Sequence, residues 1–102
     1  MKGKKPKKGK TNPYAAYLKD APSEKSFWVT NGWVIRNMEE LKTALENMND
    51  ETFLYHVNPE KNDFSIWVRE VIGDKKLAFV LQKVKSRTSA IESVKRRIKQ
   101  VK

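Results

Sequence analysis

The sequence predicts an α+β fold that is mainly helical, with an N-terminal β-hairpin, about five short helices and a disordered basic arm. An Asn-Gly pair at 31–32 separates two runs rich in aromatic and β-branched residues, a pattern typical of a hairpin. From residue 38 onward, apolar residues recur every three or four positions, as in amphipathic helices. The first ten residues contain six lysines. We therefore divide the chain into a basic arm with a short helix, residues 1–22, and a globular domain, residues 23–102, that ends in a basic helix.

The positive charge lies at the two ends of the chain. Residues 1–20 carry seven lysines and one acid, and residues 85–102 carry seven basic residues and one acid. The middle, residues 21–84, carries eight basic and ten acidic residues, although the whole chain has a net charge of +10. The sequence therefore predicts an ordinary, slightly acidic fold with cationic ends.

The first ten residues contain no apolar residue after Met1. Such a segment cannot bury enough surface to offset its ordering entropy, so we expect it to be disordered alone in water. Polyanions gain counterion-release free energy for each phosphate that a cation neutralises, which favours contact with nucleic acid. A solubilising or localisation tail, an acidic protein and a membrane surface are the alternatives. The candidate phosphate ligands in this segment are Lys2, Lys4, Lys5, Lys7, Lys8 and Lys10.

A short helix is predicted after the arm, over residues 12–19. Pro13 suits the first helical position, and Tyr14, Tyr17 and Leu18 share one face. One or two turns are not stable in isolation, so this face needs a surface to dock on. The two tyrosines either pack on their own domain or stack on unpaired bases.

The hairpin is predicted to pair residues 27–30 with residues 33–36. Asn31-Gly32 favours a two-residue type I′ turn, because both central residues of that turn need positive φ. Alternation places Phe27 on one face with Val29, and Trp28 on the other. Trp28 and Trp33 are candidate stacking surfaces for bases if they are exposed; the alternative is that both pack in the core.

Three helices are predicted before residue 73. Asn37 with Glu40 forms a capping-box pattern ahead of a helix whose inward face is Met38, Leu41, Ala44, Leu45 and Met48. A second, short helix begins with Asp50 as its cap and ends before Pro59. A third runs over residues 63–72, with Asn62 or Asp63 as cap and Gly73 at its C-terminal end.

Two further helices are predicted at the C-terminus. Asp74 caps a helix over residues 75–84, and Ser86 caps one over residues 87–101. The last helix has a narrow apolar stripe, Ile91, Val94, Ile98 and Val101, with basic residues on its other faces. We interpret it as a phosphate-facing helix; a helix that binds a partner protein is the alternative. Its candidate phosphate ligands are Lys95, Arg96, Arg97, Lys99 and Lys102.

A polar cluster lies at the turn between the second and third helices. His56, Asn58, Asn62 and Asp63 flank this turn, and His56 is the only histidine of the chain. We expect a structural network that forms hydrogen bonds with the loop and caps the third helix.

The sequence also excludes several kinds of site. A multi-histidine metal site is excluded because the chain has one histidine. A disulfide, a thiolate zinc site and a cysteine nucleophile are excluded because the chain has no cysteine. The sequence therefore predicts no enzyme, no metal and no cofactor.

Several motifs of the domain resemble a family of small domains of uncharacterised activity that is common in archaeal genomes. The resemblance covers about residues 27–87 and implies a small α+β or mainly helical fold and an archaeal source. It brings no catalytic or binding residues, and the lysine-rich arm is not part of its pattern. The residues that carry it are Asn31-Gly32, Thr52-Phe53, Tyr55-His56-Val57-Asn58, Lys61-Asn62-Asp63-Phe64, Trp67-Val68 and Gly73-Asp74 with Lys76-Leu77-Ala78.

The cationic ends predict a non-catalytic nucleic-acid-binding protein. We expect a ribosomal or ribosome-associated protein that binds rRNA within a ribosomal subunit, beside neighbouring ribosomal proteins, because a lysine-rich arm on a compact domain suits a folded polyanion. One alternative is an archaeal chromatin-type protein that binds duplex DNA. Another is an adaptor whose basic ends only tether it to nucleic acid.

The longest apolar run falls far short of the roughly 20 residues that span a bilayer, so we expect a cytoplasmic protein without a membrane partner.

Overall fold

The computed structural model describes residues 14–102. The lysines at 2–10 and the predicted helix start at Asn12 and Pro13 lie outside the described residues. The elements are, in chain order, the 3₁₀ helices η2 (Ala15–Leu18) and η3 (Ser23–Lys25), the strands β1 (Phe27–Trp28) and β2 (Val34–Ile35), α1 (Met38–Asn47), α2 (Asp50–His56), the strands β3 (Val57–Asn58) and β4 (Lys61–Asn62), α3 (Asp63–Trp67), the π-helix η4 (Val68–Ile72), α4 (Lys75–Lys83) and α5 (Arg87–Val101).

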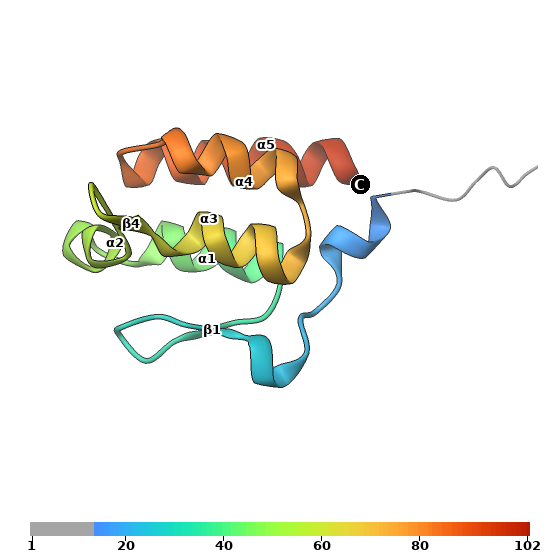
Figure 1. The fold of residues 1–102 in the computed structure, drawn as a ribbon, viewed down its shortest axis with the longest axis horizontal. Helices are drawn as coiled ribbons and strands as arrows, with labels where there is room; N and C mark the ends of the chain where they lie inside the picture. The colour runs from blue at the N-terminus through green and yellow to red at the C-terminus, as the bar shows by residue number, and fades with distance from the viewer. Residues whose placement is uncertain (1–13) are drawn as a thin grey trace, which may run out of the picture.

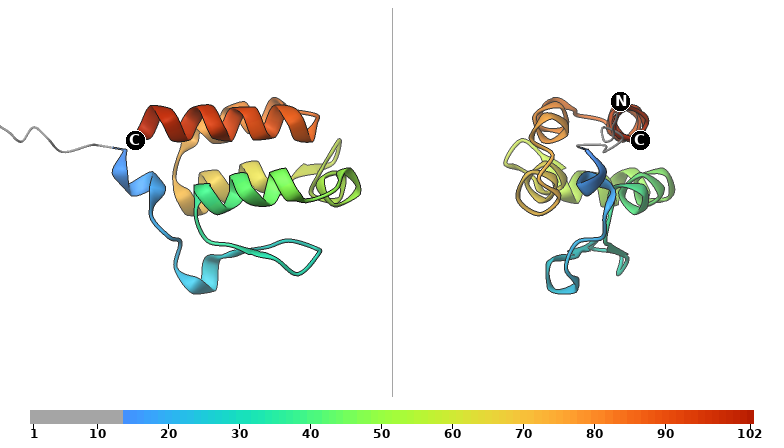
Figure 2. Two further views of the ribbon diagram at one scale, coloured as in Figure 1. Left: turned by 180° about the vertical axis from the view of Figure 1, so that it is seen from behind. Right: turned by 90° about the vertical axis from the view of Figure 1, so that its right-hand side faces the viewer.

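These elements form three layers (Figure 1). Helices α4 and α5 make one outer layer, and α1 and α3 make the middle layer, with α2 at one end. The β1–β2 hairpin lies on the far side of the middle layer from α4 and α5. The side view in Figure 2 shows α4 next to α5, above α3 and α1. The predicted fold class, α+β and mainly helical, is confirmed.

The hairpin turn differs from the predicted one by a residue. Phe27 pairs with Ile35 and Trp28 with Val34, and the Val29 amide donates to the Trp33 carbonyl at 2.8 Å. Three residues therefore lie between Val29 and Trp33, instead of the predicted two. The Gly32 amide donates to the Val29 carbonyl at 2.8 Å, and Gly32 has φ of +99°. A three-residue loop that ends in a left-handed glycine is compatible with the twist of the flanking strands, as a type I′ turn is.

Three of the predicted caps begin α1, α4 and α5. Asn37 Oδ1 accepts from the Glu40 amide at 2.8 Å, Asp74 Oδ1 from Leu77 at 3.1 Å, and Ser86 Oγ from Ser89 at 3.1 Å. These bonds satisfy amides that have no partner within the first helical turn. The capping box at Asn37 is not closed, because the Glu40 carboxylate accepts from the backbone amide and guanidinium of Arg36 instead.

The centre of the chain departs from prediction in three places. Asn49, not Asp50, caps α2, because its Oδ1 accepts from the Thr52 amide at 2.8 Å. The turn at Pro59 is closed by the short antiparallel pair β3–β4. The predicted helix at 63–72 is α3 followed by the wider turn of η4, which ends at Gly73 with φ of +89°.

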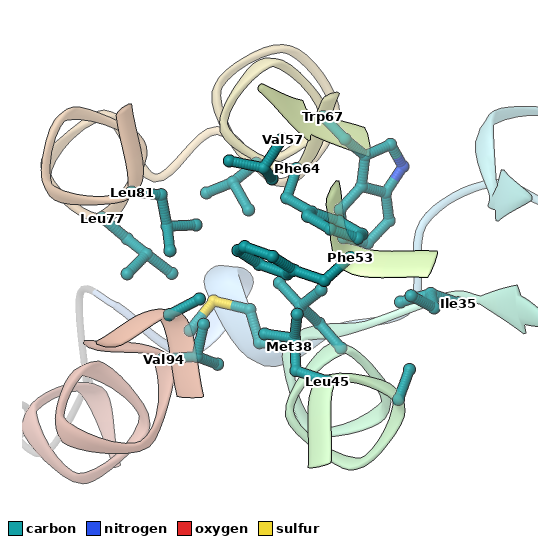
Figure 3. Packing of buried hydrophobic residues seen from close by; sticks show 14 of the residues in the cluster. Ile35, Met38, Leu45, Phe53, Val57, Phe64, Trp67, Leu77, Leu81 and Val94 are labelled. Carbon is teal, nitrogen blue, oxygen red and sulfur yellow. The ribbon is translucent and has the colours of Figure 1, made fainter. Parts of the chain in front are cut away.

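A single hydrophobic cluster joins the layers (Figure 3). Phe53 and Phe64 stack at its centre with their ring centroids 6.2 Å apart. Trp67 lies at its edge, where its indole nitrogen donates to the Lys25 carbonyl at 2.8 Å and ties η3 to α3. The predicted inward face of α1 is confirmed, because all five of its residues are buried: Met38, Leu41, Ala44, Leu45 and Met48.

The described chain begins beside the C-terminus of α5 (Figures 1 and 2). Tyr17, Leu18 and Ala21 are partly buried against the hydrophobic cluster, so η2 docks on the domain, as its apolar face requires. This packing fixes where the N-terminal segment joins the domain.

Candidate nucleic-acid interface

The positive charge of the described chain is concentrated on the α4–α5 layer. Residues 74–102 contain ten basic and two acidic residues, whereas residues 14–73 contain six basic and ten acidic ones. One layer is therefore strongly cationic, and the rest of the described chain is net negative. The exposed basic residues of this layer are Lys75, Lys76, Lys83, Lys85, Lys95, Arg96, Lys99 and Lys102.

Most of these charges have no acidic partner in the fold. Within residues 14–102, one of the eight side chains forms an ion pair: Lys102 Nζ lies 3.1 Å from Glu39 Oε2. In the other layers, by contrast, an acidic side chain lies within ion-pair distance of Arg36, Lys42, Lys61 and Arg69. The α4–α5 layer thus presents cations whose counterions must come from solvent or from a ligand.

A groove runs between α4 and α5. At one end is a hollow of about 200 Å³ whose lining includes Lys76, Arg96 and Gln100. At the other is a hollow of about 520 Å³ whose lining includes Phe79, Lys83 and Lys85. Val80 lines both hollows, so they adjoin at this residue. We call the two adjoining hollows together the α4–α5 groove.

Helical periodicity builds the two walls of the groove. On α4, Lys76, Val80 and Lys83 follow one another at i, i+4 and i+7, which is one helical face. On α5, the lining residues Ser89, Ser93, Arg96 and Gln100 also lie on one face. The two helices are antiparallel, so the start of α4 lies beside the end of α5 and basic residues occupy both ends of the groove.

Arg97 does not belong to the exposed charges, which corrects its assignment as a phosphate ligand. Its side chain is buried, with Nε 2.7 Å from Asp74 Oδ2 and Nη2 3.1 Å from Asp74 Oδ1. The hydrogen bonds that Arg97 donates to this carboxylate raise the pKa of Arg97, against the opposing effect of burial. Arg97 therefore holds α5 against the start of α4.

Tyr14 and Tyr17, the predicted base-stacking pair, lie against Arg97. The guanidinium carbon is 5.5 Å from the Tyr14 ring centroid and 5.8 Å from that of Tyr17. These distances are typical of cation–π contacts. The tyrosines thus help to close the site of the buried arginine, and they bring the N-terminal segment to the basic end of α5.

The lysine-rich segment is joined to the domain at this point. Lys10 precedes Tyr14 by four residues, and a chain spans at most about 3.6 Å per residue. Connectivity alone therefore keeps Lys10 within about 14 Å of Tyr14. The described chain therefore begins beside the basic end of α5, and the six lysines of residues 1–10 precede this point in the sequence.

His56 joins the hairpin to the central helices. The Thr30 amide donates to His56 Nε2 at 3.1 Å, so Nε2 carries no proton and Nδ1–H donates to Asp63 Oδ2 at 2.9 Å. Both ring nitrogens are engaged and the residue is 4% exposed. Burial of Asp63 opposes its ionisation, but hydrogen bonds from His56 and Lys61 outweigh this effect and hold the pKa of Asp63 below its usual value.

The side chains of the two asparagines near His56 form hydrogen bonds with the backbone. Asn58 Nδ2 donates to the Leu54 carbonyl at 3.1 Å. Asn62 Oδ1 accepts from the Ser65 amide at 3.0 Å and caps α3, while its Nδ2 donates to the Leu81 carbonyl of α4 at 2.8 Å. Each of the predicted network residues therefore forms a hydrogen bond within the fold.

A family model described as a family of unknown function (DUF5752) matches residues 22–101. The chain belongs to this family. The resemblance to an uncharacterised family of small domains is thus confirmed. No curated protein and no solved structure matches the chain.

The DUF5752 domain contains the whole α4–α5 groove and the His56 network. Among residues 14–102, no group of three or more histidine, cysteine, aspartate or glutamate side chains is placed to hold a metal ion. None of the helices described is long and apolar enough to cross a lipid bilayer.

Trp28 and Trp33, the other predicted stacking residues, are exposed on the hairpin of the DUF5752 domain. Trp28 is 70% exposed and pairs across the strands with Val34. The hairpin and the α4–α5 layer lie on opposite sides of the middle layer. The structure therefore does not bring the tryptophans together with the basic residues of α4 and α5.

One aromatic residue of the groove was missed by sequence reasoning. Phe79 is 59% exposed, and Lys83 Nζ lies 4.1 Å from its ring centroid. The helical pattern assigns Leu77, Ala78 and Leu81 to the core and leaves Phe79 on the outer face of the helix. An aromatic residue at an outward position between lysines was the signal that could have identified it.

Proposed function

We propose that this protein is a non-catalytic RNA-binding protein, ribosomal or ribosome-associated and cytoplasmic, that contacts rRNA phosphates through α4, α5 and the lysine-rich N-terminal segment. The observation that carries the proposal is the segregation of charge. Seven of the eight exposed basic side chains on the α4–α5 layer have no ion-pair partner within residues 14–102, while the rest of the described chain is net acidic.

Charge segregation favours a polyanionic partner over simple solubility. Each phosphate that a lysine or arginine neutralises releases condensed counterions, and this term provides most of the affinity of phosphate-binding proteins. A cationic layer backed by acidic layers also orients the molecule toward a polyanion. A protein that needed charge only for solubility would gain nothing from collecting it on one layer.

The N-terminal segment is a second source of positive charge in the sequence. The described chain begins at Tyr14, beside the end of α5, and six lysines lie within the first ten residues before it. A compact domain with a lysine-rich extension suits a folded RNA, where the domain binds the surface and the extension enters a crevice. This arrangement favours rRNA, with ribosomal proteins as neighbours on the remaining layers.

A second candidate function is that of an adaptor. Trp28 is 70% exposed beside Val34 on the hairpin, on the side away from the basic layer. Exposed tryptophan is enriched at the centres of protein interfaces. In that case the hairpin binds a protein, and the basic layer only tethers the complex to nucleic acid.

The test compares charge reversal on two sides of the molecule. In the full chain, Lys76→Glu with Arg96→Glu reverses two charges of the groove, and Lys25→Glu with Arg69→Glu makes the same charge change on the other layers. We expect the groove variant to lose about tenfold or more in affinity for rRNA fragments at 150 mM salt, and the control pair to lose much less. Equal losses would contradict a defined interface, and unchanged affinity in both would contradict RNA binding through the α4–α5 groove.

Two further measurements separate the alternatives. Sedimentation of cell extract should show the protein moving with one ribosomal subunit, and RNase should abolish this. Equal affinity for any duplex DNA, with association in extract removed by DNase and not by RNase, would favour the chromatin-type function. Partner binding that survives deletion of residues 1–10 but is lost in Trp28→Ala would favour the adaptor.

A further inference from the structure

We infer that the α4–α5 groove binds a short unpaired nucleotide segment, with a base stacked on Phe79 and the flanking phosphates held by the basic residues at the two ends. The inference rests on the proposed function and makes it specific. It distinguishes single-stranded RNA, such as a loop or bulge of a folded RNA, from a duplex as the ligand of this groove.

Phe79 provides an exposed aromatic surface in the groove. Phe79 is 59% exposed, whereas Leu77, Ala78 and Leu81 on the same helix are buried. The exposed ring adds little to the core, and it lies in the most basic part of the fold. Aromatic rings beside cations are the common platform of single-strand binders, because every base has a face that can stack.

Lys83 places a positive charge beside the Phe79 ring. Its ammonium lies 4.1 Å from the Phe79 ring centroid, so a positive charge is already held next to the stacking surface. A base that stacks on the exposed ring brings its own phosphate close to this positive charge. Ring and ammonium together therefore suit one nucleotide, which offers an apolar base and an anionic phosphate a few ångströms apart.

The groove alternates between polar and apolar chemistry along its length. Lys76 and Arg96 line one end, Val80 lines the middle, and Lys83 and Lys85 line the other end. An unpaired strand alternates in the same way between phosphates and base faces. A duplex hides its base faces in the stack and presents phosphates, so Val80 and Phe79 would contribute nothing to its binding.

The length of the groove limits the segment it can hold. Lys76 and Lys83 are seven residues apart on α4, which corresponds to about 10 Å at 1.5 Å per residue. A stacked strand rises about 3.4 Å per nucleotide, so the groove spans about three nucleotides. The site is thus large enough for a loop or bulge and too short for an extended single-strand track.

The buried pair beneath the groove orients one of its lining residues. Arg97, fixed by Asp74, donates from Nη1 to Gln100 Oε1 at 3.1 Å. Gln100 lines the same hollow as Lys76, and its amide oxygen is held by Arg97. Arg97 is in this sense a positioning residue for the groove.

The test uses the full chain, a ten-nucleotide single-stranded RNA and the matching ten-base-pair RNA duplex. We expect Phe79→Ala to lower affinity for the single strand about fivefold or more and to leave duplex affinity within about twofold. Phe79→Trp should retain single-strand affinity. Trp28→Ala removes an exposed aromatic from the hairpin and is the matched control, with little effect on either ligand. Urea unfolding checks that each variant is folded.

The outcomes separate this inference from the proposed function. If Phe79→Ala leaves single-strand affinity unchanged while Lys76→Glu with Arg96→Glu lowers it, the stacking inference is wrong and phosphate binding stands. Equal losses for strand and duplex would also contradict stacking. If neither variant changes affinity for either RNA, the proposed function fails as well. A change of oligomeric state in RNA-free Phe79→Ala, with RNA affinity unchanged, would assign Phe79 to a protein interface instead.

Discussion

Arg97 donates two hydrogen bonds to the carboxylate of Asp74, at 2.7 and 3.1 Å, and both side chains are buried. Asp74 Oδ1 also accepts from the Leu77 amide, so one carboxylate both begins α4 and fixes α5. The layer that carries the basic surface is thus held together by a buried pair. A bidentate arginine–carboxylate pair also fixes the relative orientation of the two helices.

Breaking this pair should be strongly destabilising. Arg97→Ala leaves the Asp74 carboxylate buried without its counter-charge, and loss of one partner of a buried pair costs about 3–5 kcal/mol of the free energy of unfolding. Urea unfolding measures the change. Arg96→Ala, next along the helix but exposed, is the control, expected to change stability by about 0.5 kcal/mol or less. A loss below about 1 kcal/mol for Arg97→Ala would contradict the role of the pair.

Asp63 should make the fold sensitive to acid. Its pKa is lower in the folded protein than in the unfolded chain, so the unfolded state binds more protons where the two states differ. The stabilisation is therefore complete above the unfolded pKa of about 4 and is lost as the pH falls through the folded pKa. Unfolding by urea at pH 5 and pH 3 should show a smaller drop for Asp63→Asn than for the natural chain. An identical drop in both would contradict this.

His56 should be structural and not catalytic. His56→Ala removes a buried ring between Phe27 and Phe64 and leaves the Thr30 amide and the Asp63 carboxylate without their partner. We expect a loss of about 2–4 kcal/mol in the free energy of unfolding, with RNA affinity of the folded protein unchanged. If stability were unchanged, the ring would be available for another role, and the assignment as a non-enzyme would need to be reconsidered.

Gly32 should be required by the hairpin loop. Its φ of +99° lies in the region that L side chains rarely adopt, although a Cβ there would meet no atom within 4 Å. The cost of Gly32→Ala is therefore conformational, about 1–2 kcal/mol of the free energy of unfolding. Gly32→Asn should cost less, because asparagine tolerates the left-handed region better. Thermal unfolding of both variants measures the difference, and equal stability of all three chains would contradict the loop geometry.

The helices were predictable because their signals are local. Apolar spacing identified the buried face of α1, and Asn37, Asp74 and Ser86 each marked a helix start through their short side chains. The hairpin was predicted, but its loop length was not, since Asn-Gly is compatible with both two- and three-residue connections. The wider turn of η4 has no sequence signal that we recognise.

The candidate site was less predictable because it depends on distant contacts. Arg97 lies in the run Lys95-Arg96-Arg97, and nothing local separates the buried member from the exposed ones. Its burial follows from Asp74, 23 residues earlier in the chain, and from the antiparallel packing of α4 and α5. Phe79 belongs to the groove only because α5 forms the opposite wall. Periodicity predicts faces of single helices, not which faces meet.

The most direct test of the central claim is the salt dependence of RNA binding by the full chain. The dissociation constant for an rRNA fragment would be measured from 50 to 300 mM salt. Contact with about eight phosphates predicts a log–log slope of the association constant of about −6 to −7, and reversal of Lys76 and Arg96 should make it shallower by about one to two. A slope near zero would contradict binding through the cationic layer.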